Sequence, residues 1–225
     1  PRNLPFVGSA AFAHKGGLHI SAVEKDPKSY EHIDPLKVGN ERTLVVSNQS
    51  GKSNVLNKLK KFKIKLKINN NQVSSFLETL KKQEYLGYAY DGAEASFELL
   101  ARRKFQKFRE FYSLESFKVS DEKRSNPQNK SIAISEARIK IFVEDKEFYS
   151  AAEGNGPIHA LDIALRKALV KFYPKIKQLN LIDYKVRILT PQDGTNALVR
   201  VRIESSNGNE KWSTIGVSQN VIDAS

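Results

Sequence analysis

The chain has 225 residues, of which 40% are hydrophobic and 28% are charged, the balance of a globular protein rather than a disordered one. It contains no cysteine and no uninterrupted apolar run of the roughly 20 residues that span a bilayer, so neither a disulfide framework nor a membrane partner is expected. We therefore expect a cytosolic protein and, because the chain opens on Pro1 and lacks methionine, a part of a longer one.

The net charge of +12 raises the question of a nucleic-acid partner. The densest basic stretch contains seven lysines, namely Lys52, Lys58, Lys60, Lys61, Lys63, Lys65 and Lys67. Four apolar residues alternate with the later lysines, namely Phe62, Ile64, Leu66 and Ile68. A period of two is typical of an exposed edge strand or extended segment whose lysines are solvated. No zinc-finger spacing or RNP-type aromatic motif accompanies them, so we expect no nucleic acid and keep a basic RNA-binding module as the alternative.

The first 112 residues divide into two predicted parts. Residues 1–35 are rich in Gly, Ala and Pro around a histidine pair, and residues 36–112 are predicted to form a helical connector subdomain. One connector helix begins near Ser50, and two more are separated by the sequence GYAYDG, with Asp91 placed to cap the last. Apolar residues recur at helical spacing in these two, at Val73, Phe76, Leu77 and Leu80 and then at Ala93, Phe97 and Leu100.

Residues 113–225 change to a strand pattern. The segment LESFKVS is followed by the polar segment DEKRSNPQNKS, which predicts an exposed loop. Two predicted strands follow, IAISEARIKIFVED and KEFYSAA. The segment GNGPIHALDIALRKALVKFY then predicts a helix with Pro157 in its first turn, where the missing N–H costs nothing.

This strand and helix pattern recurs further along the chain. Residues 136–152 align with residues 200–216, which pairs Ile139 with Ile203, and GNGPIHA aligns with SQNVIDA. We therefore predict an α+β fold in which small helical connector subdomains precede a duplicated βββα domain, with the second helix truncated at Ser225. Each unit has one apolar sheet face to cover, so we expect the two to pack pseudo-symmetrically or to form a dimer.

His14 and His19 lie five positions apart across Gly16 and Gly17, a spacing that requires a loop rather than one helix face. With no cysteine and with the other histidines distant in sequence, we do not expect this chain to build a zinc site by itself. Glycines let the backbone approach a ligand, and an imidazole can shuttle a proton, so a catalytic loop is one interpretation. The other interpretation is a structural loop in which a histidine forms hydrogen bonds with the neighbouring backbone.

Four segments together resemble the C-terminal half of the citramalate synthases, namely AFAHKGGLHISAVEKDPKSYEHIDPLKVGN, YDGAEASFELLARR, GNGPIHALDIALRKAL and DGTNALVRVRIESSNGNEKWSTIGVSQNVIDAS. The resemblance covers essentially the whole chain. More broadly, the chain is similar to the superfamily of the 2-isopropylmalate and homocitrate synthases, which remain the alternatives. The segments SYEHIDP and EASFE favour the citramalate branch.

The resemblance implies an acyltransferase of isoleucine biosynthesis that condenses acetyl-CoA with a 2-keto acid, pyruvate, in a Claisen-type reaction. In the family a divalent metal ion polarises the keto acid within a (β/α)8 barrel, a fold of roughly 250 residues. This chain contains neither such a barrel nor the His-x-His pair that binds the metal. We therefore name no metal ligands and expect the chain alone to be inactive.

The resemblance also carries two catalytic positions to this chain. His19 resembles the histidine implicated in deprotonating acetyl-CoA, and Tyr30 resembles the tyrosine that orders the reacting groups. In the family both act on the barrel of the partner subunit, so a homodimer is expected. We expect His14 to support the HKGGLHIS turn and His159 to lie on the surface of the predicted helix that begins near Pro157.

The duplicated domain resembles the LeuA-type dimerisation and regulatory domain, in which an end-product amino acid binds between the repeats and inhibits. The expected effector is isoleucine, or leucine for the 2-isopropylmalate branch. The candidate effector-binding residues are Gly154, Asn155, Gly156, Asp193 and Gly194. The first three precede a helix whose N-terminal N–H groups suit a carboxylate. The alternative is that both loops are plain turns with glycine at positive φ.

Overall fold

The structure is a computed structural model that describes residues 4–8, 10–14, 17–44, 52–64, 69–106, 108–125 and 131–225. The chain separates into two compact units. The first comprises Pro1–Lys107 with Ser213–Val217, and the second comprises Phe108–Trp212 with Ser218–Ser225. None of the described helices combines the length and the apolar character that crossing a bilayer requires.

The start of the first unit is a set of short elements, namely β1 (Ala13–His14), α1 (Gly17–Lys25), two 3-10 helices (Pro27–Ser29 and Pro35–Val38) and β2 (Thr43–Leu44). The strands β1 and β2 pair in parallel. Each 3-10 helix begins with proline and is capped by an aspartate, because Asp26 accepts from the N–H of Lys28 and Asp34 from that of Leu36. The buried side chains of Ile20 and Val23 anchor α1.

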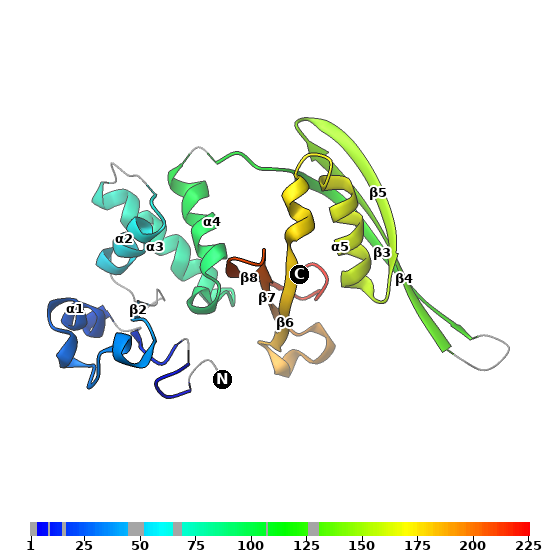
Figure 1. Ribbon diagram of the computed structural model, residues 1–225. Coiled ribbons are helices and arrows are strands. Elements are labelled where there is room, and N and C mark those ends of the chain that lie inside the picture. The colour runs from blue at the N-terminus through cyan, green and yellow to red at the C-terminus, as the bar shows by residue number, and fades with distance from the viewer. Residues whose placement is uncertain are drawn as a thin grey trace. The chain divides into compact units, whose positions relative to one another are not determined.

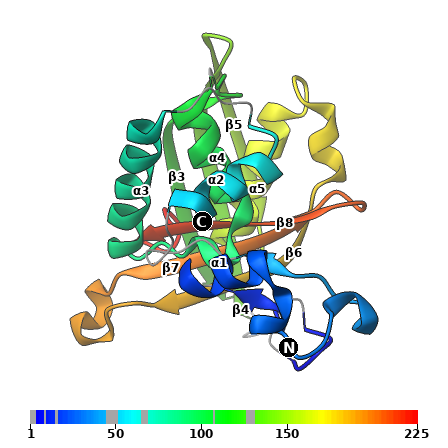
Figure 2. The ribbon, with the colours of Figure 1, turned by 90° about the vertical axis from the view of Figure 1, so that its left-hand side faces the viewer.

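Three helices form the rest of the first unit, namely α2 (Lys52–Lys61), α3 (Asn70–Tyr85) and α4 (Glu94–Phe105). Figure 2 shows the ribbons of the three helices. They contribute to a buried cluster that includes Leu59, Phe76 and Phe97, so the predicted helical connector is confirmed. Asn69 and Gln72 form a reciprocal capping box at the start of α3. The prediction that Asp91 caps the last helix is wrong, because Asp91 lies in a 3-10 turn and the residue at the N-cap is Ala93, which makes no side-chain bond.

The first part of the lysine-rich stretch is the helix α2, as the predicted connector helix near Ser50 requires. Of the part predicted to be extended, residues 62–63 form a turn and residues 65–68 lie outside the described residues. The prediction that all its lysines are solvated is wrong at Lys58. Lys58 is only 6% exposed. Its Nζ lies 3.3 Å from Oε1 of Glu94 and 5.1 Å from the ring centroid of Phe97. Burial lowers the pKa of the Lys58 ammonium, and the charge of Glu94 partly offsets this.

The second unit begins with the antiparallel sheet β3-β4-β5, followed by a helix. Its elements are β3 (Ser113–Ser125), β4 (Ser131–Val143), β5 (Lys146–Gly154) and α5 (Pro157–Leu169). The helix lies on one face of the sheet (Figure 1). There Ile139, Ile141 and Val143 pack with its alanines. The predicted loop of residues 121–131 is partly wrong, because β3 continues to Ser125, and residues 126–130 lie outside the described residues.

A second sheet of the same order follows, with the strands β6 (Asn180–Ile188), β7 (Val199–Ser206) and β8 (Lys211–Ser218). Its cross-strand register repeats that of the first sheet. Val119 faces Ala137 in the first sheet, and the aligned Val186 faces Val201 in the second. Both outer strands also carry a register shift at the same place, between Leu114 and Ser116 in β3 and between Leu181 and Asp183 in β6.

The duplication extends into the helical segment. The N–H of Ala160 donates to the carbonyl of Gly156 at 2.9 Å in the first turn of α5. The aligned N–H of Ala224 donates to the carbonyl of Asn220 at 3.0 Å, and both alanines are buried. The predicted duplicated strand–strand–strand–helix unit is therefore confirmed, including the first turn of the second helix.

Candidate functional site

His19 and Tyr30, the two predicted catalytic residues, lie in contact in the first unit. Their rings stack with centroids 4.2 Å apart and an interplanar angle of 28°. His19 is exposed on α1, and Tyr30, which is 49% exposed, directly follows the 3-10 helix Pro27–Ser29. Both rings are therefore accessible to a molecule that approaches this surface.

The local structure around His19 is a helix rather than the predicted glycine turn. Gly17 already begins α1, so His19 belongs to the first helical turn, while residues 15–16 lie outside the described residues. A helical first turn holds the imidazole more firmly than a loop would, because its backbone is fixed by the helix and by the buried Ile20 beside it.

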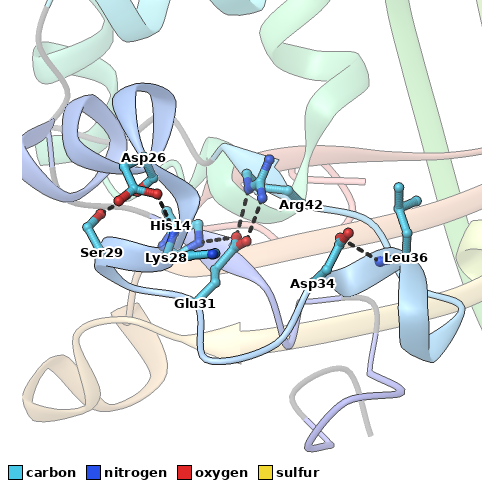
Figure 3. A network of polar contacts seen from close by, with 8 residues as sticks. All are labelled: His14, Asp26, Lys28, Ser29, Glu31, Asp34, Leu36 and Arg42. Atoms are coloured by element: carbon cyan, nitrogen blue, oxygen red, sulfur yellow. Dashed lines mark hydrogen bonds and ion pairs between the residues drawn. The ribbon is translucent and has the colours of Figure 1, made fainter.

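His14 has a buried partner, Glu31 (Figure 3). The Nε2 of His14 lies 2.9 Å from Oε1 of Glu31. Arg42 donates to the same carboxylate twice, from Nε to Oε1 at 2.7 Å and from Nη2 to Oε2 at 2.5 Å. The Arg42 guanidinium holds the pKa of the Glu31 carboxyl below its ordinary value, and His14 acts in the same direction against the effect of burial. The structure thus gives His14 a side-chain partner, while the turn that it was expected to support lies partly outside the described residues.

Sequence reasoning missed Glu31 and Arg42. Glu31 lies next to Tyr30 in the segment SYEHIDP, so its neighbourhood was recognised but its own role was not. Its partners are 17 residues before it and 11 residues after it, separations that belong to no motif. The available signal was a glutamate that directly follows the candidate residue Tyr30, together with a histidine, His14, that no metal-site spacing explained.

The described residues do not fit a metal centre. Among them, no group of three or more His, Cys, Asp or Glu side chains could hold a metal ion. The carboxylate of Glu31 is already engaged by the side chains of His14 and Arg42, which leaves it a poor ligand. We therefore derive no chemical step through a metal bound to these residues.

The first predicted effector loop joins β5 to α5. Gly154 faces the backbone of α5 so closely that a Cβ there would lie 2.5 Å from the nitrogen of Ala160. The N–H of Asn155 donates to Nδ1 of His159, whose ring is exposed as predicted. Gly156 is the N-cap of α5 and offers no side chain to its N–H groups. Neither glycine has positive φ, so the plain-turn alternative does not describe this loop.

The second predicted effector loop lies within a 3-10 segment, Pro191–Asn196, between β6 and β7. Its Gly194 has φ of 59°, which a residue with a side chain rarely adopts, so here a turn explains the glycine. Asp193 and Gly194 are both exposed. Both loops belong to the second unit.

The architecture defines an α+β fold built by duplication, in which two three-stranded antiparallel sheets follow a helical segment, the first sheet with the helix α5 and the second with a single turn after β8. The family model of the LeuA allosteric (dimerisation) domain matches residues 91–225, and the chain belongs to this family. A second model, the homocitrate synthase post-HMGL domain-like family, matches residues 6–85.

Curated relatives match the chain from end to end. It is 49% identical to an (R)-citramalate synthase of Aquifex aeolicus over 225 residues, which is 100% of this chain and 42% of that protein. It is 49% identical to the (R)-citramalate synthase of Geobacter sulfurreducens over 224 residues, with 100% and 42% covered. For that of Synechocystis sp. the identity is 48%, with 99% and 41% covered. The chain thus spans about two fifths of the length of these relatives.

Proposed function

We propose that this chain is the C-terminal regulatory and dimerisation part of an (R)-citramalate synthase, which condenses acetyl-CoA with pyruvate. The observation that carries the proposal is the identity of 48–49% over nearly every residue to three proteins of that name. The LeuA allosteric (dimerisation) domain match supports the regulatory part. The homocitrate synthase match over residues 6–85 is consistent with the wider superfamily.

The exposed His19–Tyr30 pair is the part of the chain that would reach the reacting groups. In this reaction a base removes a methyl proton of acetyl-CoA, the new carbanion attacks the keto carbon, and hydrolysis of the thioester releases CoA. We assign the imidazole of His19 as the acceptor of that proton, directly or through water, because it is solvent-accessible. The stacked ring of Tyr30 would limit rotation of the imidazole, and its hydroxyl would orient the reacting groups.

The chain alone should not catalyse the condensation. The divalent metal of the reaction belongs, on this proposal, to a barrel that these residues do not form, and the described residues offer no ligand cluster for it. We expect the isolated chain to release no CoA from acetyl-CoA with pyruvate or another 2-keto acid. A thiol assay that detects CoA release above the uncatalysed rate would contradict this assignment.

The second unit would sense the end product of the pathway, isoleucine. The first turn of α5 presents backbone N–H groups without a capping side chain, which suits the carboxylate of an amino acid. Asp193, in the second loop, would provide a carboxylate for the amino group. An effector that binds one arrangement of the homodimer more tightly would bias the chain toward it.

Calorimetric titration of the chain tests this function. We expect isoleucine to bind, with an affinity that changes little between low and high salt, and leucine to bind more weakly. A preference for leucine would move the chain to the 2-isopropylmalate branch. Binding of a single-stranded RNA with a steep salt dependence would identify a basic nucleic-acid module instead. Sedimentation of the same sample should give a dimer.

A further inference from the structure

The contact between His14 and Glu31 closes a loop that contains both candidate catalytic residues. These two side chains are 17 residues apart in sequence and meet at 2.9 Å. His19 and Tyr30 lie between them in the chain. Arg42, which directly precedes β2, joins the same carboxylate and ties the loop to a third segment (Figure 3). We name the three residues His14, Glu31 and Arg42 the Glu31 clamp.

The Glu31 clamp is built as a buried, fully engaged ionic group. The Glu31 side chain is 3% exposed, against 12% for His14 and 34% for Arg42. A buried carboxylate is stable only where cationic or hydrogen-bonding partners surround it, so the partners fix its position within narrow limits. The bidentate contact with Arg42 also fixes its orientation.

Tyr30 depends on the position of Glu31 more than on contacts of its own. The two residues are adjacent in the chain, so a fixed Glu31 side chain restricts the backbone from which the Tyr30 ring projects. The Tyr30 ring stacks on His19, and its backbone N–H donates to the carbonyl of Pro27. Tyr30 is 49% exposed, so burial in a core contributes little to its position.

We propose that Glu31 is a positioning residue, and that the Glu31 clamp holds His19 and Tyr30 in their stacked arrangement. The positioning of the His19–Tyr30 stack by the Glu31 clamp does not depend on the function of the chain. Its consequence for catalysis rests on the proposed function, because only there does His19 accept a proton. A general base displaced by about 1 Å can lose on the order of 10²-fold in rate, so a residue that touches no substrate can control turnover.

Nuclear magnetic resonance of the histidine rings tests the geometry in the chain itself. The Tyr30 ring, stacked on the imidazole, shifts the ring-proton resonances of His19 upfield, and the Tyr30→Ala variant gives the unstacked reference. We expect Glu31→Ala to move the His19 resonances at least halfway to that reference. The matched control is Asp26→Asn, which removes a carboxylate charge from the same loop while its side-chain oxygen can still cap the 3-10 helix. It should leave His19 unchanged.

A milder variant keeps the test valid if Glu31→Ala unfolds the first unit. Arg42→Lys retains the charge but cannot make the bidentate contact, and it should displace the His19 resonances partway. The resonances of His159 report on the second unit and should stay fixed in all variants. His19 resonances at their wild-type positions in both Glu31→Ala and Arg42→Lys would overturn the proposal.

Kinetics of the full-length protein that contains this chain separate the clamp from the proposed function. We expect Glu31→Gln to lower kcat by about 10- to 100-fold with little change in KM for acetyl-CoA, the pattern of a misplaced base. Glu31→Asp, which restores the charge, should recover part of kcat. If the His19 resonances move as expected but kcat does not fall, the catalytic role of His19 is refuted and the positioning of the stack is not.

Discussion

Gly154 is the residue at which a single added carbon should damage the second unit most specifically. It ends β5 opposite Ser135, on the sheet face that α5 covers. A Cβ at this position would lie 2.5 Å from the nitrogen and 2.9 Å from the Cα of Ala160. Both are backbone atoms of a helix, which cannot rotate away as a side-chain end would. Gly154→Ser therefore forces α5 away from the sheet.

The cost of this displacement follows from what lies beneath the helix. The helix α5 packs on the buried face of β4, and forced repacking of such an interior costs about 1–3 kcal/mol. The same substitution two residues further on provides the control. A Cβ at Gly156 meets nothing within 4 Å, and its φ of −175° is extended backbone. Serine is also preferred over glycine at an N-cap, so Gly156→Ser should be neutral or stabilising by ~0.3 kcal/mol.

Urea unfolding followed by circular dichroism measures both variants against the wild type. We expect Gly154→Ser to lower the free energy of unfolding of the second unit. We expect Gly156→Ser to leave that free energy unchanged or slightly higher. If both serine variants unfold at the same urea concentration, the close approach of β5 and α5 does not explain the glycine. The argument from the Cβ contact would then fail, and a role in ligand binding would be the remaining explanation for Gly154.

Three further outcomes test the first unit. Phe97→Ala removes a fully buried ring and should cost about 3–5 kcal/mol in urea unfolding, whereas Tyr85→Ala, at a position 93% exposed, should cost almost nothing. Burial raises the pKa of Tyr90 from 10.0 to about 12, so the unfolded chain ionises first and stability falls as the pH rises above 10.0. Relative to Tyr90→Phe, the loss should reach about 2 kcal/mol near pH 12. Burial lowers the pKa of Lys58 below 10.5, so the unfolded chain holds more protons in that window; the stability of the wild type should rise relative to Lys58→Met as the pH approaches 10.5, and equal slopes would refute the assignment.

The sequence was most informative where one structural period repeats over many residues. Alternation along Ile139, Ile141 and Val143 predicted a half-buried strand, and the structure places these side chains under α5. The alignment between the repeats predicted equivalent strands, and their register confirms it. The shared register shifts in β3 and β6 had no such signal, because a bulge changes the backbone pairing and leaves no required residue type in the sequence.

The prediction that the lysines of the basic stretch are all solvated is wrong at Lys58. The spacing of lysines describes neighbours in the sequence, whereas the contacts that bury Lys58 come from residues distant in the sequence. Lys58 was grouped with solvated lysines, although its partners Glu94 and Phe97 come from a different helix. A lysine side chain can place its methylene stem in a core when a carboxylate meets its ammonium group. Nothing in the spacing of the lysines distinguishes this one from its exposed neighbours Lys60 and Lys61.

The candidate site could be predicted as separate residues and not as a contact. His19 and Tyr30 were identified through their segments, one by one. Their stacking depends on how the loop between His14 and Glu31 closes, and that closure depends on an ion pair with Arg42 beyond the loop. Such three-part contacts are set by the fold, so a sequence can name the participants without showing that they meet.

Variants in the two units should have separable effects. Variants of the Glu31 clamp should change the His19–Tyr30 stack, whereas a variant at Gly154 should change the packing of α5 on its sheet, next to the proposed effector site. If isoleucine binding and the stack are independent, clamp variants will leave isoleucine affinity unchanged. If isoleucine instead moves the His19 resonances, isoleucine binding and the stack are coupled. Linkage then requires that a change in the stack also change the affinity for isoleucine. Allosteric control within these residues therefore predicts a reciprocal effect, which titration of isoleucine into the Glu31→Ala chain would measure.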